Sequence, residues 1–250
     1  MSGPILHDFS WQRMINAVEA VDRRQAHCVN AFNRAGIDYS IVGGRAAMAW
    51  VDSVDRGASR TTPNSDFLVE RVVLDRIVGA LCDDGWVYQI RNGWHTFAES
   101  ASVSFQSRVR LVFANELFRP DDLLPTPDVA ESRCLDEIRV IELEALIRMK
   151  LTAFRTIDRV HLDDLLSVAL FDPSWRKRFP PEFAPRLDAV FDSFEAWPDV
   201  FEQAKLDAGF SSDEQLAEFI RRTRELSEEV PTELPWFLVR DDAWKKVRVA

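Results

Sequence analysis

The chain of 250 residues has a mass of 28.7 kDa, and its 46% hydrophobic and 29% charged residues are ordinary for a globular protein. Its net charge of −10 argues against non-specific nucleic-acid binding, because such binding depends on neutralising phosphates with Lys and Arg. No apolar run reaches the ~20 residues that a transmembrane helix needs, and the N-terminus lacks the pattern of a secretion signal. The three cysteines are far apart and match no zinc motif. We therefore expect a cytoplasmic protein that does not contact a membrane.

Helical and extended patterns alternate along the first part of the chain. Apolar residues at helical spacing predict a helix up to Arg34, and Gly36 ends it. Alternating or apolar runs predict strands over 37–42, 65–70, 86–90 and 109–114, with helices over 46–51 and 72–83 and a hairpin turn at 91–93.

Three prolines between Arg119 and Asp128 mark a predicted boundary. We expect an α/β domain with an N-terminal helix over residues 1–127 and a helical domain over 128–250. Amphipathic patterns in the second part predict helices over 142–155, 159–170, 185–194, 197–207 and 213–229. The predicted fold class is therefore α/β (α+β), with a small mixed sheet followed by a helical C-terminal half.

The pair Gly43-Gly44 is the first candidate for a binding site, because it lies between a predicted strand and a predicted helix. Glycines there let the backbone approach a ligand closely and expose N–H groups at a helix N-terminus, which suits a triphosphate. Taken alone, the pair is more simply explained by a tight strand-to-helix turn.

The pair Asn64 and Asp66 is the second candidate. Two residues apart on a strand, their side chains leave from the same face. Mg²⁺ prefers oxygen ligands and often takes one or two carboxylates together with substrate phosphates. The alternative is that Asn64 ends the loop while Asp66 caps a helix or pairs with an arginine.

Taken together, the two segments resemble the nucleotidyltransferases of the DNA polymerase β fold. Val42-Gly43-Gly44-Arg45-Ala46-Ala47 resembles the first motif of that family, and the segment from Arg60 to Val69 resembles its Asp-x-Asp motif. A third segment, from Arg139 to Arg155 and on to Asp163-Asp164, is similar to bacterial minimal and abortive-infection-type members. The resemblance covers about residues 30–175 and implies a polymerase-β-like core with a nucleotide cleft between the two halves.

The resemblance also implies roles for single residues. Asp66 and Asn64 would be catalytic, with Asp66 holding Mg²⁺ and Asn64 assisting as a neutral ligand. The nucleoside triphosphate would be bound at one site by Gly43, Gly44, Arg45 and Lys150. Arg110, which is not part of the family pattern, is a further candidate for the nucleotide-binding site because an arginine can bind phosphate. For Lys150 the alternative is an exposed position on a surface helix, and the nearby His161 is interpreted as structural.

Two departures from the family pattern divide the functional hypotheses. Asn64 stands where the first acid is expected, and Arg110 takes the place of the third acid, so only Asp66 remains. The first hypothesis is an enzyme that transfers a nucleoside monophosphate from an NTP to a hydroxyl of a small molecule, RNA or protein. The second is a catalytically impaired member that binds a nucleotide, RNA or a protein partner, with Arg110 able to bind phosphate directly and without a metal.

Overall fold

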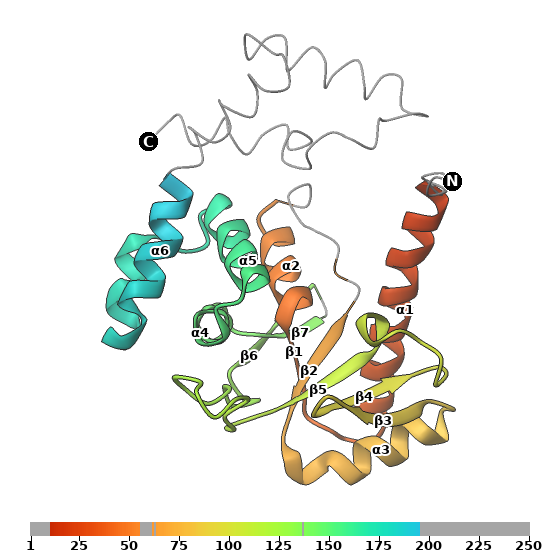
Figure 1. Cartoon of the computed structure of the whole chain (residues 1–250). Helices are drawn as coiled ribbons and strands as arrows, with labels where there is room; N and C mark the ends of the chain where they lie inside the picture. The colour runs from red at the N-terminus through yellow and green to blue at the C-terminus, as the bar shows by residue number, and fades with distance from the viewer. Residues whose placement is uncertain (1–10, 56–61, 63, 137, 196–250) are drawn as a thin grey trace, which may run out of the picture.

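A seven-stranded mixed sheet forms the centre of this computed structural model, which describes residues 11–55, 62, 64–136 and 138–195 (Figure 1). Within these residues the strand order is β3-β4-β5-β2-β1-β7-β6. The strands are β1 (Ser40–Val42), β2 (Ser65–Val69), β3 (Val87–Arg91), β4 (Trp94–Ala98), β5 (Val109–Phe113), β6 (Ser132–Leu135) and β7 (Ile138–Ile141). Strand β2 is central: it pairs in parallel with β5 and antiparallel with β1. The predicted α/β class with a mixed sheet is confirmed.

Helices cover both faces of this sheet. They are α1 (Trp11–Arg34), α2 (Gly43–Asp52), α3 (Leu74–Asp83), α4 (Leu143–Ala153), α5 (Thr156–Ser167) and α6 (Ala184–Glu195), with short 3-10 turns at Arg71–Val73, Phe105–Ser107, Pro173–Arg178 and Pro181–Phe183. Helices α1 and α3 pack together on one side, while α2, α4 and α5 form a second group (Figure 1). Because of this double cover, every residue of β2 is buried, including Asp66.

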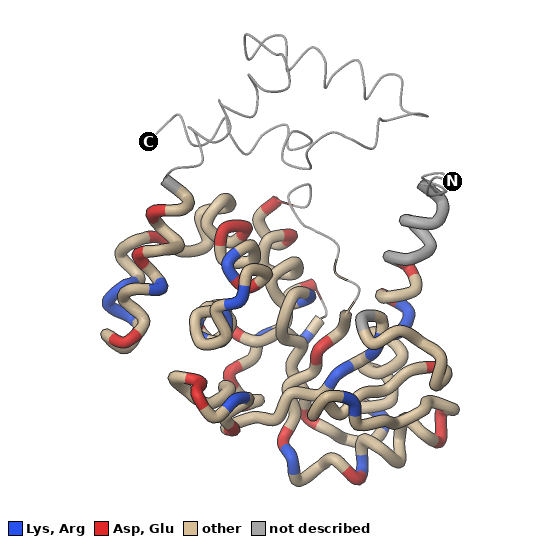
Figure 2. Tube along the Cα trace, in the orientation of Figure 1, with Lys and Arg blue, Asp and Glu red and all other residues tan. Residues whose placement is uncertain are grey.

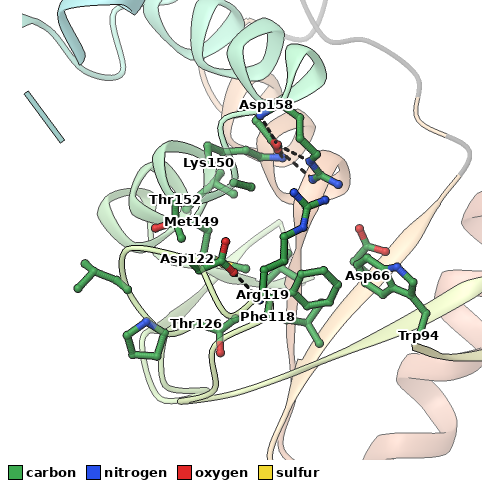
Figure 3. Close-up of a pocket in the computed structure, with 18 residues that line it drawn as sticks. Asp66, Trp94, Phe118, Arg119, Asp122, Thr126, Met149, Lys150, Thr152 and Asp158 are labelled. Atoms are coloured by element: carbon green, nitrogen blue, oxygen red, sulfur yellow. Dashed lines mark hydrogen bonds and ion pairs between the residues drawn. The ribbon is translucent and has the colours of Figure 1, made fainter. Parts of the chain in front are cut away.

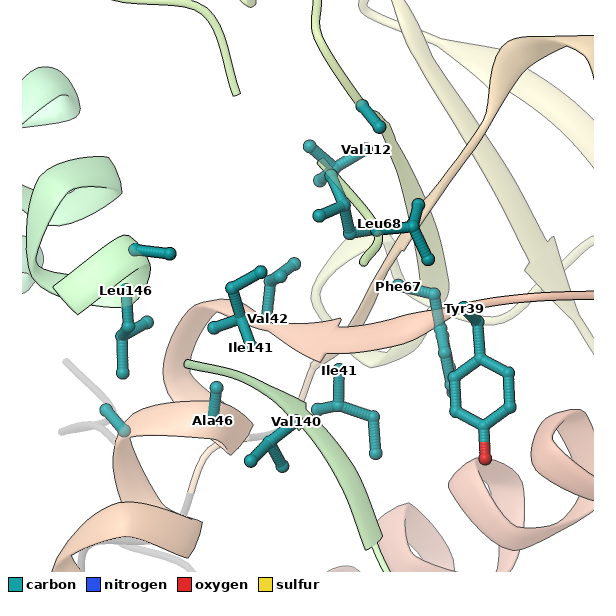
Figure 4. Packing of buried hydrophobic residues seen from close by; sticks show 14 of the residues in the cluster. Tyr39, Ile41, Val42, Ala46, Phe67, Leu68, Val112, Val140, Ile141 and Leu146 are labelled. Atoms are coloured by element: carbon teal, nitrogen blue, oxygen red, sulfur yellow. The ribbon is translucent and has the colours of Figure 1, made fainter. Parts of the chain in front are cut away.

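The core lies where the central strands meet the helices. Phe67 of β2 packs edge-on against Phe32 of α1 and against Tyr39, with ring centroids 5.2 and 5.7 Å apart. Figure 4 shows Phe67 and Tyr39 together, with Ile41 and Val140 from the neighbouring strands close by. This packing fixes which face of β2 points to α1, so that Asp66 projects to the opposite face.

The segment after residue 127 differs from the prediction at its start. It was expected to be helical, but β6 and β7 come first, and β7 joins the sheet beside β1 in parallel. Ile138, Val140 and Ile141 favour extended structure, and the short hairpin between β6 and β7 lacked a strong turn signal. The predicted helices over 142–155, 159–170 and 185–194 correspond to α4, α5 and α6. Those over 197–207 and 213–229 lie outside the described residues. In the part of the chain that is described, none of the helices combines the length and apolar character needed to cross a membrane.

Candidate functional site

The register of the sheet brings Asp66 and Arg110 side by side. Asp66 of β2 lies opposite Val42 of β1 on one side and opposite Arg110 of β5 on the other. Directly paired residues of neighbouring strands project to the same face of a sheet. The two side chains therefore leave the sheet together, on the face turned away from α1.

Asp66 and Arg110 form a two-point ion pair. Nε of Arg110 donates to Oδ1 of Asp66 at 2.5 Å, and Nη2 donates to Oδ2 at 2.8 Å. The side chain of Arg110 is only 15% exposed and that of Asp66 only 11%. The guanidinium carbon of Arg110 lies 4.8 Å from the centre of the Trp94 ring. Bidentate geometry of this kind is the strongest form of arginine–carboxylate pairing. Both oxygens of Asp66 therefore already accept hydrogen bonds from a cation.

Gly43 lies directly against this ion pair. Its φ of +70° is in the left-handed region, and a β-carbon placed on it would stand 2.5 Å from Oδ2 of Asp66. A β-carbon on Gly44 would stand 3.0 Å from Oγ1 of Thr62. The glycines thus provide the tight strand-to-helix turn and also allow Asp66 to approach the N-terminus of α2.

A second cluster of charged side chains faces Asp66 from helices α4 and α5. Nζ of Lys150 lies 3.0 Å from Oδ1 of Asp158 and 3.0 Å from Nδ1 of His161. Arg155, at the turn between the helices, donates Nε to Oδ2 of Asp158 at 2.7 Å. The side chains of Lys150 and Asp158 are 5% and 2% exposed. The surface position considered for Lys150 is therefore not the one that it occupies.

Burial and charge act in opposite directions on this cluster. Burial lowers the pKa of Lys150, because it penalises the ammonium, and the Asp158 carboxylate offsets only part of this effect. Burial alone would raise the pKa of Asp158, but Lys150 and Arg155 together bring it below its ordinary value. The hydrogen bond to Asp158 raises the pKa of Arg155. Asp158 is therefore a carboxylate that holds α4 and α5 together.

A pocket of about 90 Å³ lies between the two charged clusters (Figure 3). Val42, Gly43 and Asp66 line its sheet side, and residues of α4 and α5 line the other. The loop after β5 closes it with Phe118 and Arg119. Figure 3 shows the Arg119 side chain rising from this loop into the space between Asp66 and Asp158.

The structure brings together some of the predicted site residues but not all of them. Gly43, Asp66 and Lys150 line the pocket, and Arg110 stands behind Asp66 as its partner. Arg45 points elsewhere: it donates to Gln25 at 2.9 Å and to Asp22 at 2.6 Å, and so ties α2 to α1. Among the described residues, Gly44 packs on Thr62 and Asn64 lies just before β2, both outside the pocket lining.

Sequence reasoning missed several residues that line the pocket, among them Phe118, Arg119, Trp94 and Asp158. Phe118 and Arg119 lie next to the proline-rich segment, which suggested a boundary rather than a wall. Trp94 follows the hairpin turn and gave no sign of its role. Asp158 had one available signal, because it follows Arg155 by three residues, the spacing of a side chain that caps a helix.

The side chains around Asp66 differ from the oxygen ligands that Mg²⁺ requires. Both oxygens of Asp66 are held by Arg110, and an arginine beside the carboxylate repels a second cation. Over the described ranges, no three His, Cys, Asp or Glu side chains are grouped so as to hold a metal. Catalytic magnesium is normally held by carboxylates together with substrate phosphates. The side chains as arranged do not fit a magnesium site.

Comparison with known proteins gives structural matches alone. No family model and no curated protein matches the chain. A candidate nucleotidyltransferase from H. pylori matches with 17% identity and a TM-score of 0.43, over 80% of this chain and 86% of its own. JHP933 from Helicobacter pylori matches with 18% identity and a TM-score of 0.42, over 81% and 84%. The antibiotic-resistance factor ANT(2'')-Ia matches with 11% identity and a TM-score of 0.41, over 77% and 98%. The first of these belongs by name to the class that the sequence motifs resemble, and at such identities no residue role is transferred.

Proposed function

We propose that this chain is a nucleotidyltransferase-fold protein that binds a nucleotide through its phosphate, without a divalent cation, and does not transfer the nucleotidyl group. The observation that carries this proposal is the two-point ion pair between Asp66 and Arg110. Of the three acids that the family pattern contains, Asp66 alone is present, and it is bound to a cation of the protein itself.

The chemistry of transfer explains why this pair matters. Two-metal catalysis of phosphoryl transfer depends on carboxylates that hold both ions against the attacking and leaving oxygens. A metal at Asp66 would have to displace Arg110, which would leave a largely buried guanidinium without its carboxylate. Breaking a buried ion pair in this way costs about 3–5 kcal/mol. The ion pair therefore opposes magnesium binding in two ways. Arg110 occupies both oxygens of Asp66, and its positive charge repels the metal ion.

The surroundings of the pair favour an anion. The pocket lies at the N-terminus of α2, a helix of 10 residues whose first N–H groups carry partial positive charge. Lys150, Arg119 and Arg155 line the same space. Guanidinium groups bind phosphate oxygens through paired hydrogen bonds, and they need no metal to do so.

An active transferase is the second candidate, because Asp66 lines the same pocket as Gly43. In that case the nucleoside triphosphate predicted from the sequence would release Asp66 from Arg110, and Mg²⁺ would take its place. The acceptor would be a hydroxyl of a small molecule, an RNA or a protein.

Calorimetric titration distinguishes these two functions. ATP, GTP, CTP and UTP are titrated into the full chain in EDTA and, separately, in Mg²⁺. The binding function predicts that binding persists in EDTA and is not abolished in Asp66→Asn. The surface variant Asp38→Asn is the control, since Asp38 is exposed and pairs with Arg139 away from the pocket.

Two other outcomes contradict the proposal. Binding that requires Mg²⁺ and disappears in Asp66→Asn, but not in Asp38→Asn, would establish the metal-dependent transferase instead. Absence of binding by all four triphosphates in both buffers, together with absence of binding by the corresponding monophosphates, would remove nucleotide binding altogether.

A further inference from the structure

The charges around the pocket nearly balance one another. Among the described residues that line it, three cations face three carboxylates: Arg119, Lys150 and Arg155 against Asp66, Asp122 and Asp158. Arg110, behind Asp66, adds one positive charge. Acidic and basic residues are interspersed over the whole described chain (Figure 2), so no distant basic surface changes this balance strongly. The site offers about one net positive charge to a ligand.

Arg119 is the cation that remains available. Arg110 is bound to Asp66, while Lys150 and Arg155 are both bound to Asp158. Asp122 accepts the backbone N–H of Arg119 at 2.8 Å, which orders the loop. Within the described part of the chain, no hydrogen bond or ion pair engages the guanidinium of Arg119, which points into the pocket (Figure 3).

An aromatic surface adjoins Arg119. Phe118, the preceding residue, is 44% exposed, and its ring centre lies 4.4 Å from that of Trp94. Both rings line the pocket, and Trp94 is held in place by the guanidinium of Arg110 on its ring. A nucleobase stacks well on such surfaces, whichever base it is. One loop therefore presents a free cation next to a partly exposed aromatic ring.

We propose that this pocket takes a nucleoside monophosphate, with the phosphate on Arg119 and the base against Phe118 and Trp94. The inference rests on the proposed function, nucleotide binding without a metal, and adds the number of phosphates that the site accepts.

We infer a monophosphate rather than a triphosphate because of the charge that each ligand carries. A phosphate monoester carries about −1.5 to −2 charges at neutral pH, which the free Arg119 and the N-terminus of α2 compensate. Each further phosphate adds at least one negative charge, and in nucleoside triphosphate sites metal ions bridge and neutralise these groups. Among the described residues, the lining holds neither a set of metal ligands nor a further free cation, and it includes the acidic residues Asp66 and Asp122.

The experiment compares phosphate number at constant base. The four nucleoside monophosphates and their triphosphates are titrated in EDTA, with adenosine and inorganic phosphate as partial ligands. For the base that binds best, the monophosphate is expected to bind at least as tightly as the triphosphate. Phe118→Ala should weaken the monophosphate about tenfold and leave inorganic phosphate unchanged. Arg119→Gln should weaken both ligands, whereas Arg23→Gln, a surface arginine of α1 paired with Glu19, should weaken neither.

Failure of this inference can be distinguished from failure of the proposed function. A triphosphate that binds more tightly than its monophosphate in EDTA would overturn this inference and leave nucleotide binding intact. Adenosine binding as tightly as AMP would also overturn it, because the phosphate would then contribute nothing. If no nucleotide binds, the proposed function fails together with the inference.

Discussion

Gly43 and Asp66 are so close that a β-carbon on Gly43 would stand 2.5 Å from Oδ2 of Asp66. The glycine turn and the acid of the second motif are thus parts of one packing arrangement. Any side chain at position 43 would have to push Asp66 away from the turn and disturb its pair with Arg110.

Gly43→Ala should therefore destabilise the protein. The left-handed φ of +70° alone costs an alanine about 1–2 kcal/mol, and the displaced carboxylate adds to this. The free energy of unfolding in urea measures the effect. Gly79→Ala is the matched control, since a β-carbon there meets nothing within 4 Å, and alanine in this exposed helical position should stabilise by about 0.5–1 kcal/mol. Equal effects of the two substitutions would contradict the packing argument.

Asp158→Asn should be among the most destabilising single changes in the described part of the chain. It removes the carboxylate that pairs with Lys150 and Arg155 and leaves a buried ammonium without a counter-charge. Loss of one partner of a buried pair costs about 3–5 kcal/mol. Asp188→Asn breaks the surface pair with Arg176 and should cost at most about 1 kcal/mol. Urea unfolding of both variants tests the difference, and similar losses would show that the Asp158 pair is no stronger than a surface pair.

Stability should fall in acid because of the same carboxylate. The pKa of Asp158 is lower in the folded chain than its ordinary value of 3.8. Below 3.8 the unfolded chain therefore binds a proton before the folded chain does, so that stability decreases as the pH falls through this range. Thermal unfolding from neutral pH to below pH 3.8 should show a smaller acid decrease in Asp158→Asn than in the parent chain. An unchanged acid decrease would assign the effect to other groups.

The double substitution Asn64→Asp with Arg110→Asp should create a response to Mg²⁺. It restores the two missing acids of the family pattern and removes the cation that occupies Asp66. A ligand that binds only the folded state stabilises it by about 2.7 kcal/mol at one hundred times its Kd, so Mg²⁺ should raise the Tm of the double variant.

The single variant Asn64→Asp is the control for this experiment, because Arg110 still holds Asp66 in it. Its Tm, like that of the parent chain, should not respond to Mg²⁺. A parent chain stabilised by Mg²⁺ would contradict the role given to Arg110.

Local patterns in the sequence were sufficient for much of the fold. The helix ending at Gly36, the hairpin at residues 91–93 and the central strand of Ser65–Val69 depend on short-range spacing and turn chemistry, and they were predicted. Local patterns did not predict strands β6 and β7, because the second of them is stabilised by pairing with β1, far away in the sequence.

The candidate site could likewise be predicted only as far as local patterns reach, and the rest depends on contacts between distant segments. Pairing of Asp66 with an arginine was one of the two interpretations of that residue, and it required only the residue types. That the arginine is Arg110 depends on the parallel register of β2 and β5, which no local pattern specifies. Lys150 was predicted near the ligand, but its burial against Asp158 follows from the packing of α4 on α5. Arg119 was missed because loops carry no periodic signal.

The pairing of β1 with β7 has a consequence for how the chain reaches its native state. Ile41 lies beside Val140, so one edge of β1 stays unpaired until the chain has been synthesised well past residue 127. Contacts between such distant segments make folding slow, and an open strand edge is a site for aggregation. A fragment ending at residue 127 would expose this edge permanently, and the emerging chain exposes it for the time that the intervening residues take to leave the ribosome.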